Sequence, residues 1–514
     1  MNNAQLLVSP YLPAAEYIPD GEPHVFGDRL YIFGSHDRYG GRRFCMNDYV
    51  SWSAPLSDLS DWRCEGVIFR KCQDPDSPDG AIELWAPDVT LGPDGRYYLY
   101  YCLANQYKIG VAVCDSPAGR YEFYGYVQDA FGAAVGTRPG DAKPFDPAVI
   151  VDDSGRIHLY SGQGPLNHAW AEGWTQEGRD AHVSSYHMEL ATDMLTIITE
   201  PVPVAPSLLD GVGTAFEGHE FFEGSSIRCF NGKFYFIYSS VQSHELCWSV
   251  ADTPEGPFSY GGVLISNGDV GTAGEFTETC DTKPADRRVF NYIGNTHGSV
   301  ELVNGEYYVF YHRHTARRAF SRQACVSKVI MDADGRFLPA LMTSCSFSDT
   351  LPTGHAYEAR IACELYSAGG AVYSSPKVQD ETHPAFVQDR DEDFEYETVT
   401  PPKSAPMQYI ENMRDGATAV YRWFDAADLA KVSRLSVTVR GSAEGYFEFT
   451  TRSPELMLGR INVTSGTDWH TCTCTAVSDA FCVSHSPAGT DAGTALYVTY
   501  HGQGAADFAA FSLG

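Results

Sequence analysis

The sequence predicts an all-β protein, a five-bladed β-propeller followed by a C-terminal β-sandwich. One strand–turn–strand pattern occurs five times within about the first 350 residues, where helical periodicity is almost absent. Its strands are short and rich in aromatic and β-branched residues, with turn residues between them. Beyond that point the pattern changes and no further copy follows. Strand-rich repeats of this kind are typical of propellers, in which four-stranded blades surround a central channel.

Each repeat places a polar residue at the head of a first strand, then a turn, then an aromatic second strand. The equivalent points of the second strands are Tyr31, Tyr97, Ile157, Phe234 and Tyr307, which are 60 to 77 residues apart. The polar residues are Asp20, Asp88, Asp146, Glu223 and His297. On five blades they would converge at one end of the channel and form a site. The alternative is that such residues only form turns, which is the favoured reading for one copy but not for five in register.

Three long segments are predicted to be loops on this β scaffold. They cover residues 130–141, 164–180 and 267–287. The second carries Trp170 and Trp174, which could overhang the channel mouth. Long loops on a rigid scaffold often carry specificity.

The pattern changes around residues 351–354, which divides the chain into a propeller domain over 1–350 and an accessory domain over 355–514. Residues 372–393 are polar and are predicted to be a loop. Strand-like runs follow at 419–424, 434–440, 445–450, 496–500 and 508–511. Evenly spaced short strands of this kind predict a β-sandwich.

Composition narrows the classes of partner. The 514 residues carry a net charge of −30, which argues against nucleic acid and anionic membranes and fits a neutral substrate. Acidity that only keeps the protein soluble would explain the charge equally well. The fourteen cysteines show no zinc or redox spacing, and no apolar run is long enough to span a membrane. The N-terminus lacks a basic start with an apolar run, so we expect a cytoplasmic protein.

The ordered motifs at the blade heads resemble those of glycoside hydrolase family 43. They are Pro19-Asp20-Gly21-Glu22-Pro23, Gly34-Ser35-His36-Asp37, Trp85-Ala86-Pro87-Asp88, Phe145-Asp146-Pro147, Phe222-Glu223-Gly224 and Asn295-Thr296-His297-Gly298. The resemblance implies a five-bladed propeller that acts on arabinose and xylose glycosides. Through Gln408-Tyr409-Ile410, Val437-Thr438-Val439-Arg440-Gly441 and Gly502-Gln503-Gly504-Ala505-Ala506-Asp507-Phe508, the C-terminal part is similar to carbohydrate-binding modules of family 6. A structural or oligomer-forming role is at least an equal alternative. The chain departs from many family members at Ser225 and Ser226, where proline often follows the Glu-Gly pair.

The resemblance implies an inverting mechanism with three carboxylates. Asp20 would be the general base, Glu223 the general acid, and Asp146 the residue that orients the acid and tunes its pKa. Such a reaction needs one ionised and one protonated carboxyl, far enough apart to admit a water molecule. A neighbouring negative charge raises the pKa of the acid, which suits an Asp146 close to Glu223.

Further residues are candidates for contacts with the substrate. The Trp85 indole could lie against a sugar ring or pack in the core, and His36 could bond sugar hydroxyls or Asp37. Arg322 would bond the substrate or keep Asp20 ionised. Asp88 could be structural.

The resemblance also implies a metal, usually calcium, on the propeller axis beside His297, with a structural and electrostatic role. The alternative is a histidine bonded to carboxylates without metal. In the C-terminal part, Glu358 and Asp507 could contribute to a calcium site like those of similar modules.

The sequence therefore predicts an exo-acting α-L-arabinofuranosidase or β-xylosidase that trims oligosaccharides. One alternative is a retaining hydrolase of the fructosidase type, although Pro19-Asp20-Gly21 lacks the asparagine expected there. A second is a propeller that binds glycans without cleaving them. The sequence leaves open the sugar, the linkage and the oligomeric state, for which the C-terminal part could supply a contact.

Overall fold

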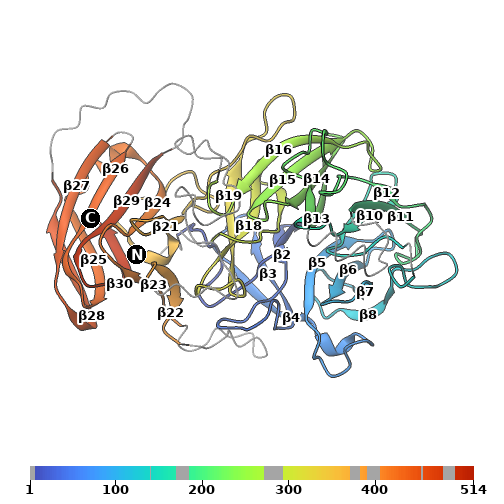
Figure 1. The fold of residues 1–514 in the computed structure, drawn as a ribbon, viewed down its shortest axis with the longest axis horizontal. Coiled ribbons are helices and arrows are strands. Elements are labelled where there is room, and N and C mark those ends of the chain that lie inside the picture. The colour runs from blue at the N-terminus through green and yellow to red at the C-terminus, as the bar shows by residue number, and fades with distance from the viewer. Residues whose placement is uncertain are drawn as a thin grey trace.

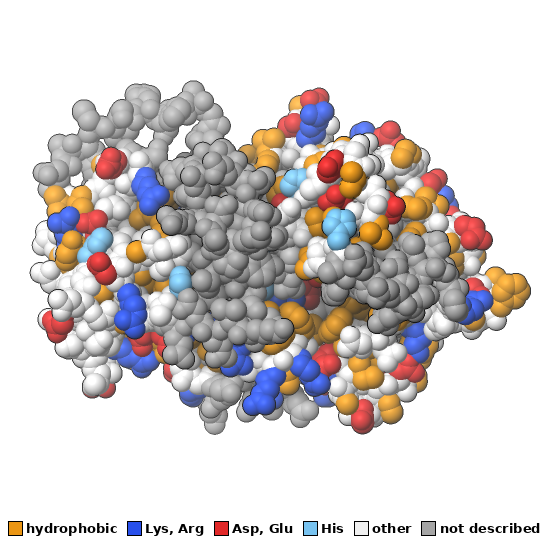
Figure 2. Space-filling model, in the orientation of Figure 1, with side chains coloured by type: hydrophobic (Ala, Val, Ile, Leu, Met, Phe, Trp, Pro, Cys, Tyr) orange, Lys and Arg blue, Asp and Glu red, His pale blue; other side chains and the backbone are white. Residues whose placement is uncertain are grey.

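The computed structural model confirms an all-β protein made of a propeller and a sandwich, which lie side by side in Figure 1. It describes residues 6–138, 141–168, 184–270, 293–370, 382–390, 406–452, 455–477 and 493–514. On the face seen in Figure 2, acidic side chains are scattered over both units and basic ones lie among them.

The propeller consists of five antiparallel sheets, in each of which consecutive strands are neighbours. Blade one contains β1 (Glu22–Phe26), β2 (Arg29–Phe33), β3 (Tyr49–Pro55) and β4 (Arg63–Phe69). Blade two contains β5 (Leu84–Leu91), β6 (Tyr97–Leu103), β7 (Ile109–Cys114) and β8 (Glu122–Tyr126). Blade three contains β9 (Ala148–Val151), β10 (Ile157–Gly162), β11 (Ser185–Leu190) and β12 (Val202–Pro203). Blade four contains β13 (Phe221–Phe230), β14 (Lys233–Ser240), β15 (Glu245–Ala251) and β16 (Ser259–Ser266). Blade five contains, among the described residues, β17 (Ser299–Val303), β18 (Glu306–His314) and β19 (Arg322–Val329).

The first strands of the blades form a closed ring. Each of β1, β5, β9, β13 and β17 contacts the next, and β17 contacts β1 again. A bridge between Gly21 and Gly298 joins the first and fifth blades at the channel. The five equivalent points predicted from the repeat all lie on second strands, β2, β6, β10, β14 and β18.

Side chains of one strand alternate between the two neighbouring blades. On β6, Leu99 and Tyr101 pack against blade one, while Tyr98 and Tyr100 pack against blade three. Because both faces of a blade are covered, both sets of side chains are apolar. This explains why the strands read as continuous apolar runs with aromatic residues.

The C-terminal unit is a sandwich of two antiparallel sheets around one apolar core. The first sheet contains β22 (Ala385–Gln388), β23 (Gln408–Met413), β30 (Ala506–Leu513), β25 (Arg434–Gly441) and β28 (Gly466–Thr475), with β20 (Ala356–Glu358) on β30. The second contains β21 (Glu364–Tyr366), β24 (Thr418–Phe424), β29 (Thr494–Gln503), β26 (Glu444–Arg452) and β27 (Glu455–Val463). The predicted loop over 372–393 was wrong in part, since β22 lies within it and pairs with β23.

Helices are rare in this fold. The described ones are η1 (Lys71–Gln73), η2 (Ala359–Ile361) and α2 (Ala426–Leu429). None of the helices in the described part of the chain is long and apolar enough to cross a membrane.

A buried ion cluster joins the two units. Arg422 of β24 donates to Asp269, which follows blade four, at 2.6 Å, and also to Glu364 of β21. All three side chains are almost fully shielded from water. Despite the favourable arginine, burial raises the pKa of Glu364 to about 8, and the nearby Asp269 acts in the same direction. The guanidinium is thus the cation for two carboxyl groups that water cannot reach, and it opposes the rise in the pKa of Glu364 without cancelling it.

Replacing Arg422 by methionine is expected to lower the free energy of unfolding by about 3–5 kcal/mol, because two buried carboxyl groups lose their counter-charge. Urea unfolding followed by circular dichroism would measure this. Arg460→Met, which removes an exposed ion pair with Glu448, is the matched control and should change stability by less than about 1 kcal/mol. Adding Asp269→Asn and Glu364→Gln to Arg422→Met should restore part of the loss. Equal effects of Arg422→Met and the control would contradict the expectation.

Candidate active site

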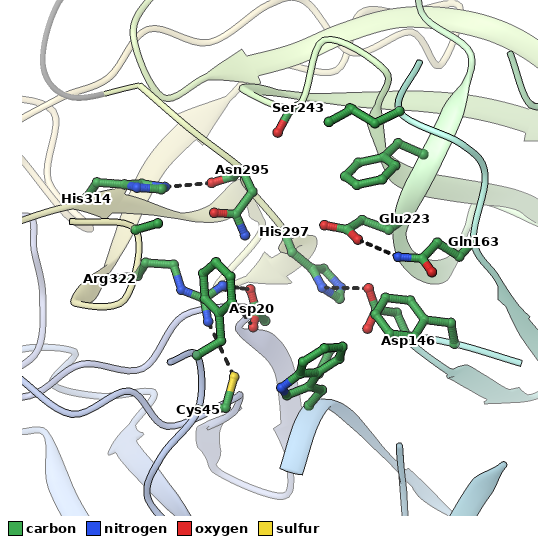
Figure 3. Close-up of a pocket in the computed structure, with 17 residues that line it drawn as sticks. Asp20, Cys45, Asp146, Gln163, Glu223, Ser243, Asn295, His297, His314 and Arg322 are labelled. Atoms are coloured by element: carbon green, nitrogen blue, oxygen red, sulfur yellow. Dashed lines mark hydrogen bonds and ion pairs between the residues drawn. The ribbon is translucent and has the colours of Figure 1, made fainter. Parts of the chain in front are cut away.

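One cavity opens at the propeller axis, where the blade heads meet. Its volume is about 340 Å³, within the range of small-ligand sites. The apolar part of its wall consists of Phe44, Trp85, Ala86, Phe145, Leu166, Phe222 and Ala319. The polar part consists of Asp20, Cys45, Asp146, Gln163, Glu223, Ser243, Asn295, His297, His314 and Arg322. Figure 3 shows Asp20 beside Arg322 on one side, Glu223, Asp146 and Gln163 on the other, and His297 between them.

Asp20 stands two residues before the start of β1, on a left-handed backbone (φ 57°), and is buried. Arg322 Nη1 donates to its two carboxylate oxygens at 3.0 and 3.3 Å. Although burial raises the pKa of Asp20, the positive charge of Arg322 and the other neighbouring groups outweigh burial and leave that pKa below its usual value. Asp20 is therefore ionised at neutral pH. Arg322 forms an ion pair with it, which is one of the two roles that the sequence suggested for this arginine.

Arg322 is itself held from the other side. Its Nε donates to Asp37 Oδ2 at 2.9 Å, and its Nη2 donates to Asp37 Oδ1 at 3.0 Å. The guanidinium also lies over the Phe44 ring, 4.7 Å from the ring centroid. Asp37 thus fixes Arg322 in the orientation that faces Asp20.

Glu223 lies near the start of β13 and projects into the cavity from blade four. Burial raises the pKa of Glu223 to about 7, and the Asp20 carboxylate acts in the same direction. The Gln163 amide opposes this rise by donating to Oε2 at 3.2 Å. Glu223 can consequently hold a proton near neutral pH, while Asp20 cannot.

Asp146 precedes β9 and, like Asp20, has a left-handed backbone (φ 43°). Its Oδ2 accepts a hydrogen bond from Gly224 N at 3.1 Å, so it is tied to the residue next to Glu223. Burial and the neighbouring Glu223 raise the pKa of Asp146 well above its usual range. Left-handed non-glycine residues are costly and often mark functional sites, and two of them carry carboxylates in this cavity.

His297 lies between the carboxylates of Asp146 and Glu22. Its Nδ1 is 3.8 Å from Asp146 Oδ2, and its Nε2 is 3.9 Å from Glu22 Oε1. Among the described residues, neither Nε2 of His297 nor Oε1 of Glu22 has a hydrogen-bond partner, and both atoms are buried. The other oxygen of Glu22 accepts from Arg228 at 2.8 Å. Two unsatisfied ligand atoms that face each other fit a bound water or a hydrated cation.

Two groups of described side chains bring three possible metal ligands together. One contains Glu22, His24 and Asp88 on the axis, and the other contains His219, Glu245 and Cys247 in blade four. Among the described residues, Glu358 and Asp507 belong to neither group; Glu358 pairs with Arg360, and Asp507 pairs with Arg440.

The structure also places three further residues that the sequence singled out, Trp85, His36 and Asp88, and only Trp85 lines the cavity. Trp85 lies in the cavity wall, with its ring edge-on to Phe145 at 5.6 Å. His36 does not line the cavity, because its ring is buried against the carbonyl of Asp48 and the carboxylate of Glu16.

Asp88 also lies outside the cavity, so the five blade heads do not all converge. It is fully buried and bonds His24 at 2.7 Å and the backbone NH of Val149 at 2.8 Å. The reason is its register, since β5 begins at Leu84 and Asp88 is four residues inside the strand. Trp85 and Ala86 occupy the cavity wall in its place.

Several cavity residues were missed at the level of sequence. They are Phe44, Cys45, Gln163, Leu166, Ser243, Asn295, Ala319 and His314, together with His312 behind Asp20. A usable signal existed for the histidines, because residues two apart on a strand share a face. His312 and His314 of β18 both direct Nε2 to the carbonyl of Asn295, at 2.7 and 2.9 Å. Trp170 and Trp174 lie outside the described residues.

The chain has clear relatives among known proteins. A model described as glycosyl hydrolases family 43 matches residues 18–224. A xylosidase/arabinosidase of Thermoclostridium stercorarium is 44% identical over 509 residues, which cover 98% of each chain. A xylosidase/arabinosidase of Bacteroides ovatus is 30% identical over 64% of this chain and 96% of its own.

A solved structure is also similar to this chain. It is a family 43 β-xylosidase/α-arabinofuranosidase from a compost microbial metagenome, described as a calcium-free form in complex with xylotriose. It is 25% identical, covers 65% of this chain and 97% of its own, and has a TM-score of 0.49. With a relative 44% identical over nearly the full length of both chains, this protein belongs to glycoside hydrolase family 43 and is a glycosidase.

Proposed function

We propose that this protein is an inverting, exo-acting glycosidase that releases L-arabinofuranose or D-xylose from oligosaccharides derived from plant polysaccharides. Two relatives that carry the name xylosidase/arabinosidase support this substrate class. The single observation that carries the mechanism is the contrast between two carboxyl groups of one cavity. The pKa of Asp20 is lowered and that of Glu223 is raised to about 7, which separates a base from an acid.

In the proposed reaction, Asp20 accepts a proton from a water molecule as the water oxygen attacks the anomeric carbon. The glycosidic C–O bond breaks, its electron pair goes to the leaving oxygen, and Glu223 donates a proton to that oxygen. Asp146 positions the segment of Glu223 through its bond to Gly224 N. Arg322 keeps Asp20 ionised, and the aromatic wall with Trp85 excludes water and packs against the sugar ring.

The test is hydrolysis of a panel of aryl glycosides: α-L-arabinofuranoside, β-D-xyloside, β-D-galactoside and β-D-fructofuranoside. Release from the first or second is the expected result, with the opposite anomer as the first product in a proton NMR time course. Retained configuration would favour the fructosidase-type mechanism. Binding of xylo-oligosaccharides without hydrolysis of any substrate would favour a glycan-binding propeller.

We further propose that the axial pair of His297 and Glu22 holds Ca²⁺. The ion would supply positive charge at the base of a carboxylate-rich cavity. Thermal unfolding is expected to shift upward in CaCl₂ relative to chelator, by the equivalent of about 2.7 kcal/mol at a hundredfold excess over Kd. The shift should be absent in His297→Ala and should not be reproduced by MgCl₂. An identical unfolding temperature with and without calcium would assign the space to water.

A further inference from the structure

A line of three side chains runs from the protein surface to the carboxyl group of Glu223. Lys143 Nζ donates to Gln163 Oε1 at 2.5 Å, and Gln163 Nε2 donates to Glu223 Oε2 at 3.2 Å. Gln163 is buried, and Lys143 is partly exposed, with its ammonium 4.8 Å from the centre of the Tyr107 ring. Figure 3 shows Gln163 behind Glu223, with the other carboxyl oxygen directed into the cavity.

The backbone holds Gln163 in this place. Gly162 N donates to Phe145 O at 2.9 Å, and Gly164 N donates to Phe222 O at 2.7 Å. The residues on both sides of Gln163 are thus fastened to the segments that carry Asp146 and Glu223. Gly162 has a left-handed φ of 154°, and a side chain there would meet the Ser184 carbonyl at 1.9 Å, so this close approach requires glycine.

The lysine decides which end of the amide faces Glu223. An ammonium group only donates hydrogen bonds, so the atom of Gln163 that faces Lys143 must be the carbonyl oxygen. The amide NH₂ therefore points to Glu223. Oε2 accepts this NH, and the carbonyl oxygen of a carboxylic acid is a better acceptor than its hydroxyl oxygen, so the acid proton is favoured on Oε1.

We propose that Lys143 and Gln163 are positioning residues that place the proton of Glu223 on Oε1, toward the leaving group, and stabilise the carboxylate formed when that proton is transferred. The proposal rests on the proposed function of Glu223 as the general acid. When the proton moves from Oε1 to the glycosidic oxygen, the negative charge left on Glu223 is shared with the Gln163 NH. Lys143 acts on Glu223 mainly through the orientation of Gln163, and the direct effect of its charge is smaller.

Two variants of Gln163 test the donor. Gln163→Leu removes the amide, and Gln163→Glu keeps its size while replacing NH₂ by a carboxyl oxygen. In both, the alkaline limb of the kcat/KM profile should move up by about one pH unit, because a bond to the ionised form is lost. For alkyl glycosides, which need protonation of the leaving oxygen, kcat should fall about tenfold. For 2,4-dinitrophenyl glycosides, whose leaving group needs no proton, kcat and KM should change less than about twofold.

The role of Lys143 is tested by comparing the effect of its replacement in the presence and in the absence of Gln163. Lys143→Met should shift the alkaline limb upward as well, because the amide can then rotate and accept the Glu223 proton. Its effect should be much smaller in the Gln163→Leu background, because there is no amide left to orient. Lys233→Met, which removes an exposed ion pair with Asp252, is the matched control and should leave both profiles unchanged.

The outcomes separate this inference from the proposed function. If the wild type hydrolyses glycosides and Glu223→Gln is inactive on alkyl glycosides, the acid assignment holds. In that case, unchanged pH limbs and unchanged leaving-group dependence in both Gln163 variants would overturn the inference alone, as would additive effects of Lys143→Met and Gln163→Leu. A wild type without glycosidase activity would instead overturn the proposed function.

Discussion

Replacement of Asp20 by asparagine is expected to lower kcat about 10²–10⁴-fold for every leaving group, because the attacking water loses its proton acceptor. Asparagine keeps the size of the side chain and can still accept a hydrogen bond from Arg322 through its carbonyl oxygen. Arg322 also retains both bonds to Asp37, so no buried charge is left unpaired. Steady-state hydrolysis of an alkyl and a 2,4-dinitrophenyl glycoside, with thermal unfolding as a check on the fold, would measure the effect.

The specific role of Asp20 can be isolated with an external nucleophile. Azide needs no general base, and Asp20→Gly is compatible with the left-handed backbone at this position. In this variant, azide should restore turnover of the dinitrophenyl substrate and give a glycosyl azide of inverted configuration. Asp153→Asn, on an exposed turn of blade three, is the matched control and should be as active as the wild type. More than a tenth of wild-type activity in Asp20→Asn would mean that another group activates the water.

The propeller was predictable from sequence because each blade buries its strands in the same way, so the same pattern of apolar residues recurs along the chain. Both faces of each blade are buried, so the second strand of each blade is an apolar run with aromatic residues, most clearly in Tyr97–Leu103 and Lys233–Ser240. The strand β22 was not predictable in the same way. It has only four residues in a polar stretch, and it exists because β23 supplies its hydrogen-bond partners.

The residues of the site also differ in whether the repeat predicted them. Asp20, Asp146 and Glu223 share one position of the repeat, so the repeat indicated that they meet. Asp88 precedes its turn residue Arg96 by 8 residues, whereas Asp146 and Glu223 precede theirs by 10, so Asp88 lies deeper in its strand. Gln163 has no counterpart in the repeat pattern. Its role follows from two backbone bonds beside it, one within blade three and one to blade four, and the second forms only when the two blades pack together.

Replacement of Glu223 by glutamine is expected to separate substrates by their leaving groups. For alkyl or sugar leaving groups, kcat should fall about 10²–10⁴-fold, because the departing oxygen is no longer protonated. For 2,4-dinitrophenyl glycosides the loss should be small, since that anion leaves unaided. Glu306→Gln, whose carboxylate pairs with Lys328 on the surface, is the control for the loss of one acidic group.

Within the cavity, the pKa of both Glu223 and Asp146 is raised, and the pH dependence of activity in variants of each decides which one is the general acid. The pKa of Glu223 is about 7 and its protonated form is the acid, so wild-type activity should be present below that pH and fall as pH rises through it. Because the pKa of Asp20 is lowered, the base stays ionised over this whole range. In Glu223→Gln, the residual activity on alkyl glycosides should therefore lose its alkaline limb near pH 7. Asp146 is the competing acid, since its pKa is also raised, but its Oδ2 is bonded to Gly224 N and faces His297. A limb near pH 7 that persists in Glu223→Gln and disappears in Asp146→Asn would transfer the role of general acid to Asp146.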